Sequence, residues 1–279
     1  MNFINELVSK SNYKQYLERM TNSVFQSSKG LIPEYAAGKT LDVGCGSGVL
    51  LDMLEKKNIK AEGIDVNTEA VKTCIEKGFN AKNIALENVT EKYDTVIFSS
   101  VLHEVSSYAQ ENRFGTKPIE KALQDAKKVL NKDGKIIIRD GIRGKKSSGY
   151  LIAKDIETTQ AFERFMEESP IFEDIYTREL YQISGNRIMA PQWILKEFIF
   201  TYTWGQESWD REIKEQFGIL SKKKWKRILK DNGFEILTFT VSGEEYEKYA
   251  ENLFASDEML KEILSKCTVL IVAKVKDSL

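Results

Sequence analysis

The spacing of apolar residues changes along the chain and predicts four segments. At the start, apolar side chains recur at roughly helical spacing; short apolar runs then alternate with amphipathic stretches. The alternation later stops over a long stretch and resumes towards the end of the chain. We therefore predict an N-terminal helical segment (1–38), a core (39–140), an inserted segment (141–220) and a C-terminal part of the core (221–279).

The alternating segment predicts a parallel sheet. Each short apolar run is a strand, and each amphipathic stretch is a helix that returns the chain to the same edge of the sheet through a right-handed crossover. A weaker strand is predicted near residues 79–84. The clear strands are residues 40–43, 61–64, 95–99 and 135–139, and the helices are residues 49–57, 69–77 and 119–130.

The inserted segment is rich in aromatic side chains, which predicts a small core of its own. We predict a loop over residues 141–150 and a helix over residues 151–168, so that the insert forms a largely helical, aromatic cap. Beyond the insert, the core is completed by a helix from Ser221, a strand over 234–241, a polar helical stretch over 243–266 and a strand over 268–275.

Composition narrows the class of protein. With 279 residues, 42% hydrophobic residues and a net charge of -1, the chain is typical of a soluble globular protein and unlike a nonspecific polyanion binder. No stretch approaches the roughly 18 apolar residues of a membrane span, and the N-terminus lacks the apolar core of a signal peptide. The scattered Cys45, Cys74 and Cys267 predict neither a disulfide framework nor a zinc site. We expect a cytoplasmic protein without a membrane partner.

A glycine turn carries the first chemical signal. The stretch L-D-V-G-C-G-S-G places Gly44, Gly46 and Gly48 between a predicted strand and a helix. Glycine lets the backbone approach a ligand closely, and the free N–H groups of the helix start face that ligand. Asp65 follows about twenty residues later, at the end of the next strand, where a carboxylate can accept hydrogen bonds from a ribose diol. The pattern predicts a nucleotide-cofactor site.

Four motifs together resemble those of the class I S-adenosylmethionine-dependent methyltransferases. L-D-V-G-C-G-S-G and E-G-I-D-V-N resemble their first two motifs. Y-D-T-V-I-F-S-S-V-L-H-E-V is similar to their fourth strand and the cleft-facing segment after it, and L-N-K-D-G-K-I-I-I-R-D to the passage into the fifth strand. The resemblance covers residues 38–140 and 221–275. It implies an α/β, Rossmann-like three-layer sandwich with a seven-stranded, mostly parallel sheet whose last strand is antiparallel, and an insertion after strand 5.

The resemblance also implies a cofactor and the residues that hold it. The cofactor is S-adenosyl-L-methionine, the product is S-adenosyl-L-homocysteine, and no metal is expected. Asp42 orients the turn or meets the amino group, Asp65 holds the ribose hydroxyls, and Val66 packs on the adenine. The chain has no clear Asp after its third strand, so Asn83 and Ile84 are the candidates there. The remaining cofactor residues are Gly44, Cys45, Gly46 and Gly48 at the turn and Ser99 and Ser100 at the methionine end.

Proton removal, where the acceptor requires it, has three candidates. His103 is the chain's single histidine, follows the fourth strand and has an ordinary pKa near 6.5. It is either a general base, a cleft-lining residue or a capping residue. Glu104 is the second candidate base, or a carboxylate at a helix start. Asp140 ends the fifth strand and faces the same side, because open α/β sheets bind ligands at the carboxyl ends of their strands.

Several residues are candidates for binding the acceptor. Arg139 and Arg143 either meet an anionic acceptor or are solvated. Tyr202, Trp204 and Trp209 either stack on a planar acceptor or form the core of the insert. Two further groups have the same ambiguity: Tyr13, Tyr16 and Arg19 close the cleft or pack on the domain, and the K-K-K-W-K-R run at 222–227 contacts RNA or covers a solvated face.

The sequence therefore predicts an enzyme that transfers a methyl group from S-adenosylmethionine to O or N of a small-molecule acceptor. Alternatives are a methyltransferase acting on RNA or a nucleotide, a non-catalytic S-adenosylmethionine-binding accessory protein, and the same fold performing other sulfonium chemistry. The acceptor and the oligomeric state stay open.

Overall fold

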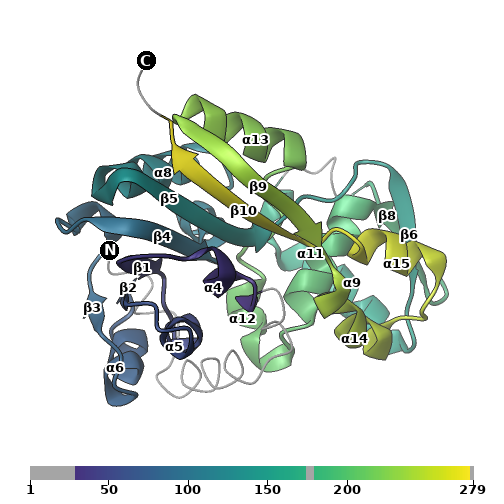
Figure 1. Cartoon of the computed structure of the whole chain (residues 1–279). Coiled ribbons are helices and arrows are strands. Elements are labelled where there is room, and N and C mark those ends of the chain that lie inside the picture. The colour runs from purple at the N-terminus through teal and green to yellow at the C-terminus, as the bar shows by residue number, and fades with distance from the viewer. Residues whose placement is uncertain (1–28, 174–178, 277–279) are drawn as a thin grey trace.

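The structure, a computed structural model, describes residues 29–173 and 179–276. Two lobes lie side by side in it: a large twisted sheet covered by helices, and a smaller lobe containing α9, α11, α14 and α15 (Figure 1). The predictions for residues 1–28, including Tyr13, Tyr16 and Arg19, lie outside the described residues.

The large sheet has seven strands in the order β3-β2-β1-β4-β5-β10-β9. The first five pair in parallel, whereas β10 runs antiparallel to both β5 and β9. This confirms the predicted α/β fold with a mostly parallel seven-stranded sheet. The strands are β1 (Thr40–Val43), β2 (Ala61–Asp65), β3 (Ala81–Asn83), β4 (Tyr93–Ser99), β5 (Leu130–Gly141), β9 (Phe234–Ser242) and β10 (Thr268–Val275).

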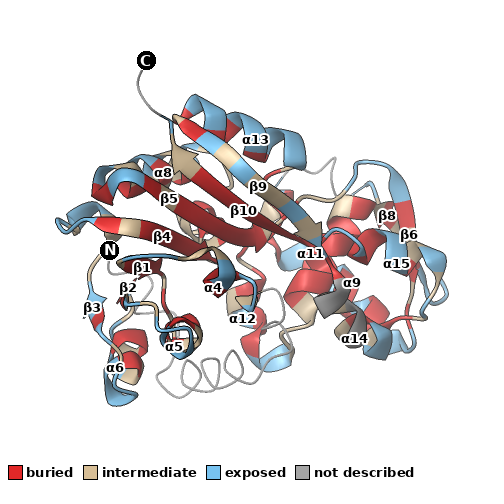
Figure 2. Ribbon diagram, in the orientation of Figure 1, coloured by how far each residue is buried: buried red, intermediate tan, exposed pale blue. Residues whose placement is uncertain are grey.

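Helices cover both faces of this sheet. Alternate residues of the central strands point to opposite faces, so Val96 and Phe98 pack with α8 and α13, whereas Ile97 packs with α4 and α5. Because both faces are covered, the central strands are continuously apolar and buried (Figure 2). The helices of this lobe are α4 (Ile32–Tyr35), α5 (Val49–Lys56), α6 (Thr68–Glu76), the 3-10 turn η1 (Leu86–Asn88), α7 (Leu102–Ser107), α8 (Lys117–Val129) and α13 (Lys222–Asp231).

The insert after β5 differs from its prediction by containing a small sheet. Residues 148–152 form a strand rather than the end of a loop and the start of a helix, because Ser-Gly-Tyr-Leu-Ile alternates in burial and pairs antiparallel with β8. The sheet order is β6-β8-β7. The elements are β6 (Ser148–Ile152), α9 (Ile156–Glu168), η2 (Pro170–Phe172), β7 (Gln182–Ser184), β8 (Arg187–Pro191), α11 (Gln192–Tyr202), η3 (Gln206–Ser208) and α12 (Trp209–Glu212).

The smaller lobe also recruits a later part of the chain. The predicted division assigns residues 221–279 wholly to the core, yet α14 (Glu244–Leu253) and α15 (Glu258–Leu264) pack into the aromatic cluster of the insert. These two helices connect β9 to β10 and reach across to the insert (Figure 1). We call residues 148–220 and 244–264 together the cap. No helix among the described residues is long and apolar enough to cross a membrane.

Candidate functional site

The glycine turn has the backbone conformation that its sequence predicts. Gly44, Gly46 and Gly48 have φ of +72°, +53° and +80°, which other residues rarely adopt. A Cβ on Gly44 would lie 2.6 Å from the Val101 side chain, so the turn also needs glycine for space. Gly48 is the residue before α5, where no side chain caps the helix. The N–H groups of Gly44 and Gly46 are used within the protein, by Ile64 O and Asp65 Oδ2, so it is the uncapped first turn of α5 that can face a ligand.

Two acidic side chains border this turn. Asp65, at the end of β2, accepts hydrogen bonds from Gly46 N at 3.0 Å and from Asn67 N at 2.8 Å. Asp42, in β1, is buried, and burial raises its pKa to about 7, although Lys29 partly offsets the rise. Burial also raises the pKa of Asp65, against the opposing effect of its backbone hydrogen bonds. A cationic or hydrogen-bond-donating ligand would relieve the cost of burying both carboxylates.

A cavity of about 310 Å³ opens beside the turn, at the carboxyl ends of β1, β2 and β4. This is the edge at which open α/β sheets bind ligands. The cavity brings together most of the predicted cofactor residues and one candidate base. Those that line it are Asp42, Gly44, Cys45, Gly46, Asp65, Val66, Ile84, Ser99, Ser100 and Glu104.

Two predicted cofactor residues lie behind the wall of this cavity. Gly48 packs against Phe79 and Cys74 at the start of α5. The Asn83 side chain donates a hydrogen bond to the backbone oxygen of Asp65 at 2.9 Å. Asn83 thus holds the end of β2, whereas its neighbour Ile84 lines the cavity.

The two serines after β4 lie in the cavity wall in different ways. The Ser99 hydroxyl is buried and has no hydrogen-bond partner among the described residues. Ser100 has a φ of +58°, a strained conformation of the kind that concentrates at functional sites. Its backbone N–H donates to Arg139 O at 2.7 Å, and its hydroxyl contacts the Arg139 guanidinium. Arg139 is therefore buried behind Ser100 and does not line the cavity.

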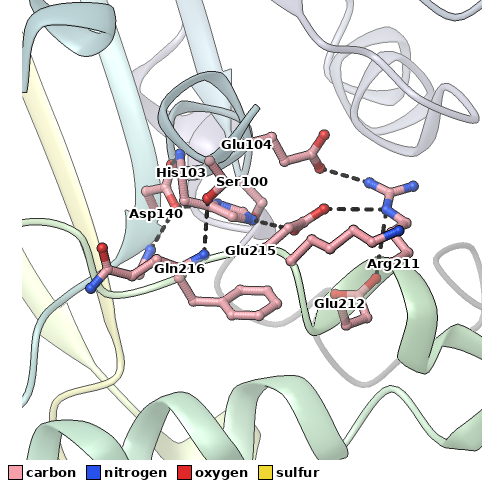
Figure 3. A network of polar contacts seen from close by, with 12 residues as sticks. Ser100, His103, Glu104, Asp140, Arg211, Glu212, Glu215 and Gln216 are labelled. Carbon is pink, nitrogen blue, oxygen red and sulfur yellow. Dashed lines mark hydrogen bonds and ion pairs between the residues drawn. The ribbon is translucent and has the colours of Figure 1, made fainter. Parts of the chain in front are cut away.

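His103 lies between two carboxylates (Figure 3). Its Nδ1 is 2.7 Å from Asp140 Oδ1, its backbone N–H donates to Asp140 Oδ2 at 3.1 Å, and its Nε2 is 3.4 Å from Glu215 Oε2. Burial lowers the pKa of His103, but Asp140 and Glu215 outweigh it and raise the pKa well above its usual value. Neither His103 nor Asp140 lines the cavity. Since carboxylates engage both imidazole nitrogens and favour the protonated ring, the geometry does not fit the expected general base.

From Glu215 the network continues to the cavity. Glu215 Oε1 accepts a hydrogen bond from Tyr108 Oη at 2.9 Å and from Arg211 Nε at 3.3 Å. Arg211 then donates from Nη2 to Glu104 Oε1 at 3.0 Å. Burial raises the pKa of Glu104 to about 7, while Arg211 pulls it down. A carboxyl with this pKa is divided between its two protonation states near neutral pH, which suits proton transfer.

A second glutamate of the cap, Glu212, lies beside this network. Glu212 Oε1 is 3.7 Å from Arg211 Nε, and burial raises the pKa of Glu212 well above its usual value. The pKa of Glu215 is shifted the other way. Arg211, His103 and Tyr108 overcome the effect of burial and lower it. The surroundings of these two neighbouring glutamates therefore shift their pKa values in opposite directions.

His103, Glu104 and Glu215 also place ligand atoms within 4.8 Å of one another, a spacing that a metal ion can use. In this structure the guanidinium of Arg211 already pairs with both carboxylates, and His103 is held by Asp140. The three candidate metal ligands are thus already engaged by protein side chains. The expected absence of a metal stays a prediction.

The aromatic residues expected to stack on an acceptor form the core of the cap instead. Trp209 is 1% exposed, and its Nε1 donates to Glu168 at 2.7 Å. Tyr202 stacks on Phe198 with ring centroids 5.3 Å apart, and Trp204 packs against the same cluster. None of the three lines the cavity. High aromatic density in the sequence therefore indicated a packed interior.

What the cap does contribute to the cavity is charged. Asp210, Arg211 and Lys214, from α12 and the turn after it, line the cavity. Arg143 lies elsewhere, with its guanidinium over the Trp193 ring at 5.0 Å. The sequence carried one signal for the missed residues: the run W-D-R-E-I-K-E-Q concentrates charge within an aromatic stretch, where charge is unexpected unless it is paired.

Part of the chain is similar in sequence to known proteins. A family model described as methionine biosynthesis protein MetW matches residues 25–131. An uncharacterized methyltransferase of Schizosaccharomyces pombe is 29% identical over 159 residues, which is 52% of this chain and 58% of that protein. This chain therefore spans less than two thirds of the length of that relative.

Solved structures resemble nearly the whole chain. The 1,6-didemethyltoxoflavin N1-methyltransferase of Burkholderia thailandensis, solved with 1,6-didemethyltoxoflavin and S-adenosylhomocysteine bound, matches with a TM-score of 0.53 at 10% identity, covering 96% of this chain and 85% of that chain. A SAM-dependent methyltransferase from Archaeoglobus fulgidus matches with a TM-score of 0.51 at 16% identity, covering 94% and 99%. At these identities the likeness concerns the fold.

Proposed function

Because the chain has the fold of the class I S-adenosylmethionine-dependent methyltransferases, as its motifs predict, we propose that it transfers a methyl group from S-adenosylmethionine to O or N of a small-molecule acceptor. One observation carries the proposal. The cavity beside the glycine turn has the expected cofactor residues on one side and Glu104, with its raised pKa, on the other. Donor and acceptor sites would thus share one cavity.

The cofactor supplies a methyl group that its sulfonium already makes electrophilic. Gly44 and Gly46 let the backbone approach it, and Asp65 offers the remaining lone pairs of its two oxygens to the ribose hydroxyls. Val66, which is 46% exposed, and Ile84 offer apolar surface to the adenine. Asp42 meets the amino group, because a buried carboxyl with a raised pKa regains its charge beside a cation.

Glu104 receives the proton of the acceptor in this proposal. It lines the cavity, and its pKa of about 7 lets the carboxylate exist at neutral pH and still accept a proton. His103 and Asp140 act through other residues: Asp140 orients the imidazolium, the imidazolium holds Glu215, and Glu215 holds Arg211 against Glu104. They are positioning residues rather than catalytic ones.

The acceptor is proposed to be a small molecule because the part of the cavity not assigned to the cofactor is lined by apolar, aromatic and charged side chains together. Tyr108 and Val105 from the core face Arg211 and Lys214 from the cap. An RNA acceptor has one observation in its favour. The basic side chains of α13 point to solvent while Trp225, Ile228 and Leu229 are buried. None of the residues of α13 lines the cavity, so this face does not lead to the cofactor site.

The test is methyl transfer from radiolabelled S-adenosylmethionine to fractionated metabolites and, separately, to total RNA. We expect label in a small-molecule fraction, with equal amounts of S-adenosylhomocysteine formed. Glu104→Gln should lose this transfer and keep S-adenosylhomocysteine binding. Label in RNA alone would establish the nucleotide-acceptor alternative. Binding of the cofactor without product from any fraction would favour the non-catalytic accessory protein.

A further inference from the structure

Two thiols meet at the glycine turn. Cys45 lies in the turn and lines the cavity, whereas Cys74 lies in α6 behind the cavity wall. Their Sγ atoms are 3.9 Å apart, and the side chains are 6% and 0% exposed. The third cysteine, Cys267, is buried in the cluster of the cap. Sequence spacing gave no sign of the pair, because the two residues are separated by a helix and a strand.

Cys74 also supports the turn from its outer side. Its thiol donates a hydrogen bond to Gly46 O at 3.2 Å, and its sulfur would lie 3.1 Å from a Cβ on Gly48. Gly46 is in turn the residue whose N–H donates to Asp65 Oδ2 at 3.0 Å. A movement of the Cys74 sulfur therefore reaches Gly46, whose other peptide group positions Asp65.

We propose that Cys45 and Cys74 are a thiol-modification site, where a reversible disulfide forms and weakens cofactor binding. The inference rests on the cofactor site proposed above. A disulfide holds its sulfurs at about 2.05 Å, so these two must approach by nearly 2 Å. The hydrogen bond from Cys74 to Gly46 is lost in that movement, because its proton leaves. The glycines of the turn supply the backbone freedom for the change.

The reaction balances with a low-molecular-weight disulfide as the oxidant. The Cys45 thiol loses its proton and attacks one sulfur of the oxidant. A mixed disulfide forms, and the first thiolate leaves and takes up that proton. The Cys74 thiol then loses its proton and attacks the Cys45 sulfur, and the second thiolate of the oxidant leaves. Two protein thiols are oxidised to one disulfide while the oxidant is reduced to two thiols. Cys45 reacts first because it is the member of the pair that lines the cavity.

Cofactor and disulfide then oppose each other. If the disulfide weakens cofactor binding by some factor, the bound cofactor must disfavour the disulfide by the same factor. A ligand bound beside the turn also blocks the access of the oxidant to Cys45, because Cys45 lines the cavity. The reduced protein is therefore the form that binds the cofactor, and the cofactor protects its own site from oxidation.

The experiment oxidises the full chain with 2-hydroxyethyl disulfide and measures two properties. Peptide mapping should show a Cys45–Cys74 linked peptide. Calorimetric titration with S-adenosylhomocysteine should show affinity weakened about tenfold or more relative to the reduced protein, and restored by a reducing agent. Saturating S-adenosylhomocysteine during oxidation should lower the yield of linked peptide. Cys267→Ser is the matched control and should behave like the wild type. Cys74→Ser lacks the resolving thiol, so it should give no Cys45–Cys74 linked peptide and should keep the hydroxyethylthio group of the oxidant on Cys45.

Two results would overturn the inference: oxidised wild type without the linked peptide, or linked peptide with unchanged ligand affinity. Both use the wild-type protein, so neither depends on the folding of a variant. A failure of the proposed function looks different. The reduced protein would then bind no S-adenosylhomocysteine at all, and the linked peptide would form equally with and without it.

Discussion

The two lobes meet at one cavity but contribute to it in opposite ways. The sheet lobe contributes a backbone turn and the carboxylates that follow its strands. The cap, whose sequence is crowded with aromatic residues, keeps these rings in its own core and contributes Asp210, Arg211 and Lys214. In the sheet lobe, the backbone of the strands and the glycine turn positions the groups that line the cavity. In the cap, ion pairs and hydrogen bonds between side chains position them.

This difference assigns different roles to the two sides of the cavity. A glycine turn at a strand end is formed by local sequence and exists before any ligand arrives. The cap residues become a site only through the chain of contacts from Asp140 to Glu104, which crosses from one lobe to the other. In the proposed function, the sheet lobe therefore binds the methyl donor, and the contact between the lobes supplies the groups that act on the acceptor.

The strongest way to break this division is to remove Glu215. In Glu215→Gln, the buried His103 and the half-buried Arg211 lose the ionised carboxylate between them. Breaking a buried ion pair costs about 3 kcal/mol or more, so the free energy of unfolding in urea should fall by about that amount. The matched control is Glu163→Gln, an exposed glutamate of the cap, which should change it by less than about 0.5 kcal/mol. Equal effects in the two variants would show that the network does not join the lobes.

Glu104→Gln separates the chemistry from donor binding. The base is lost, so we expect methyl transfer to fall at least about 100-fold while S-adenosylhomocysteine affinity is kept. In the wild type, transfer should rise with pH until the pH passes about 7, because only the ionised carboxylate accepts a proton. A wild-type rate that is flat across this range would assign the proton to water or to no base at all.

The same substitution makes a prediction about stability with a definite sign. The pKa of Glu104 is raised to about 7 by burial, so the folded state binds this proton more tightly than the unfolded state does. The stability that the proton contributes is present below the unfolded pKa and is lost as the pH rises through about 7. Relative to Glu104→Gln, the wild type should therefore lose stability between acidic pH and pH 8 in urea titrations. A stability gap that does not change with pH would contradict the buried environment of Glu104.

Asp65→Ala tests the sheet-lobe side. The variant loses the acceptor proposed for the ribose hydroxyls and two backbone hydrogen bonds that shape the turn. Hydrogen bonds to a charged group contribute about 1.5–3 kcal/mol, so S-adenosylhomocysteine affinity should fall at least about tenfold. Asp231→Ala, an exposed aspartate at the end of α13, is the control and should bind like the wild type. Unchanged affinity in Asp65→Ala would remove the ribose assignment.

The sequence predicted the cavity residues of the sheet lobe better than those of the cap. The sequence was enough to bring Gly44, Gly46 and Asp65 to one cavity, because a strand, a turn and a helix start are local features set by order along the chain. Arg211 and Glu215 could not be identified, because their roles depend on partners more than one hundred residues away, such as Glu104 and His103. His103 follows β4 but does not line the cavity, and its pKa is set by two carboxylates that only the fold brings to it.

The smallest expected effect tests the aromatic side of the cap. Tyr202 was a candidate for stacking on the acceptor, yet its ring stacks on Phe198 and lies outside the cavity lining. Tyr202→Phe keeps the ring, so the affinity for S-adenosylhomocysteine and the rate of methyl transfer should stay within about twofold of wild type, since substitutions away from special features are nearly neutral. Unchanged unfolding in urea would show that the variant is intact. A clear loss of transfer with unchanged stability would mean that the cap turns its rings towards the acceptor during the reaction, and the aromatic cluster would then be part of the acceptor site rather than its support.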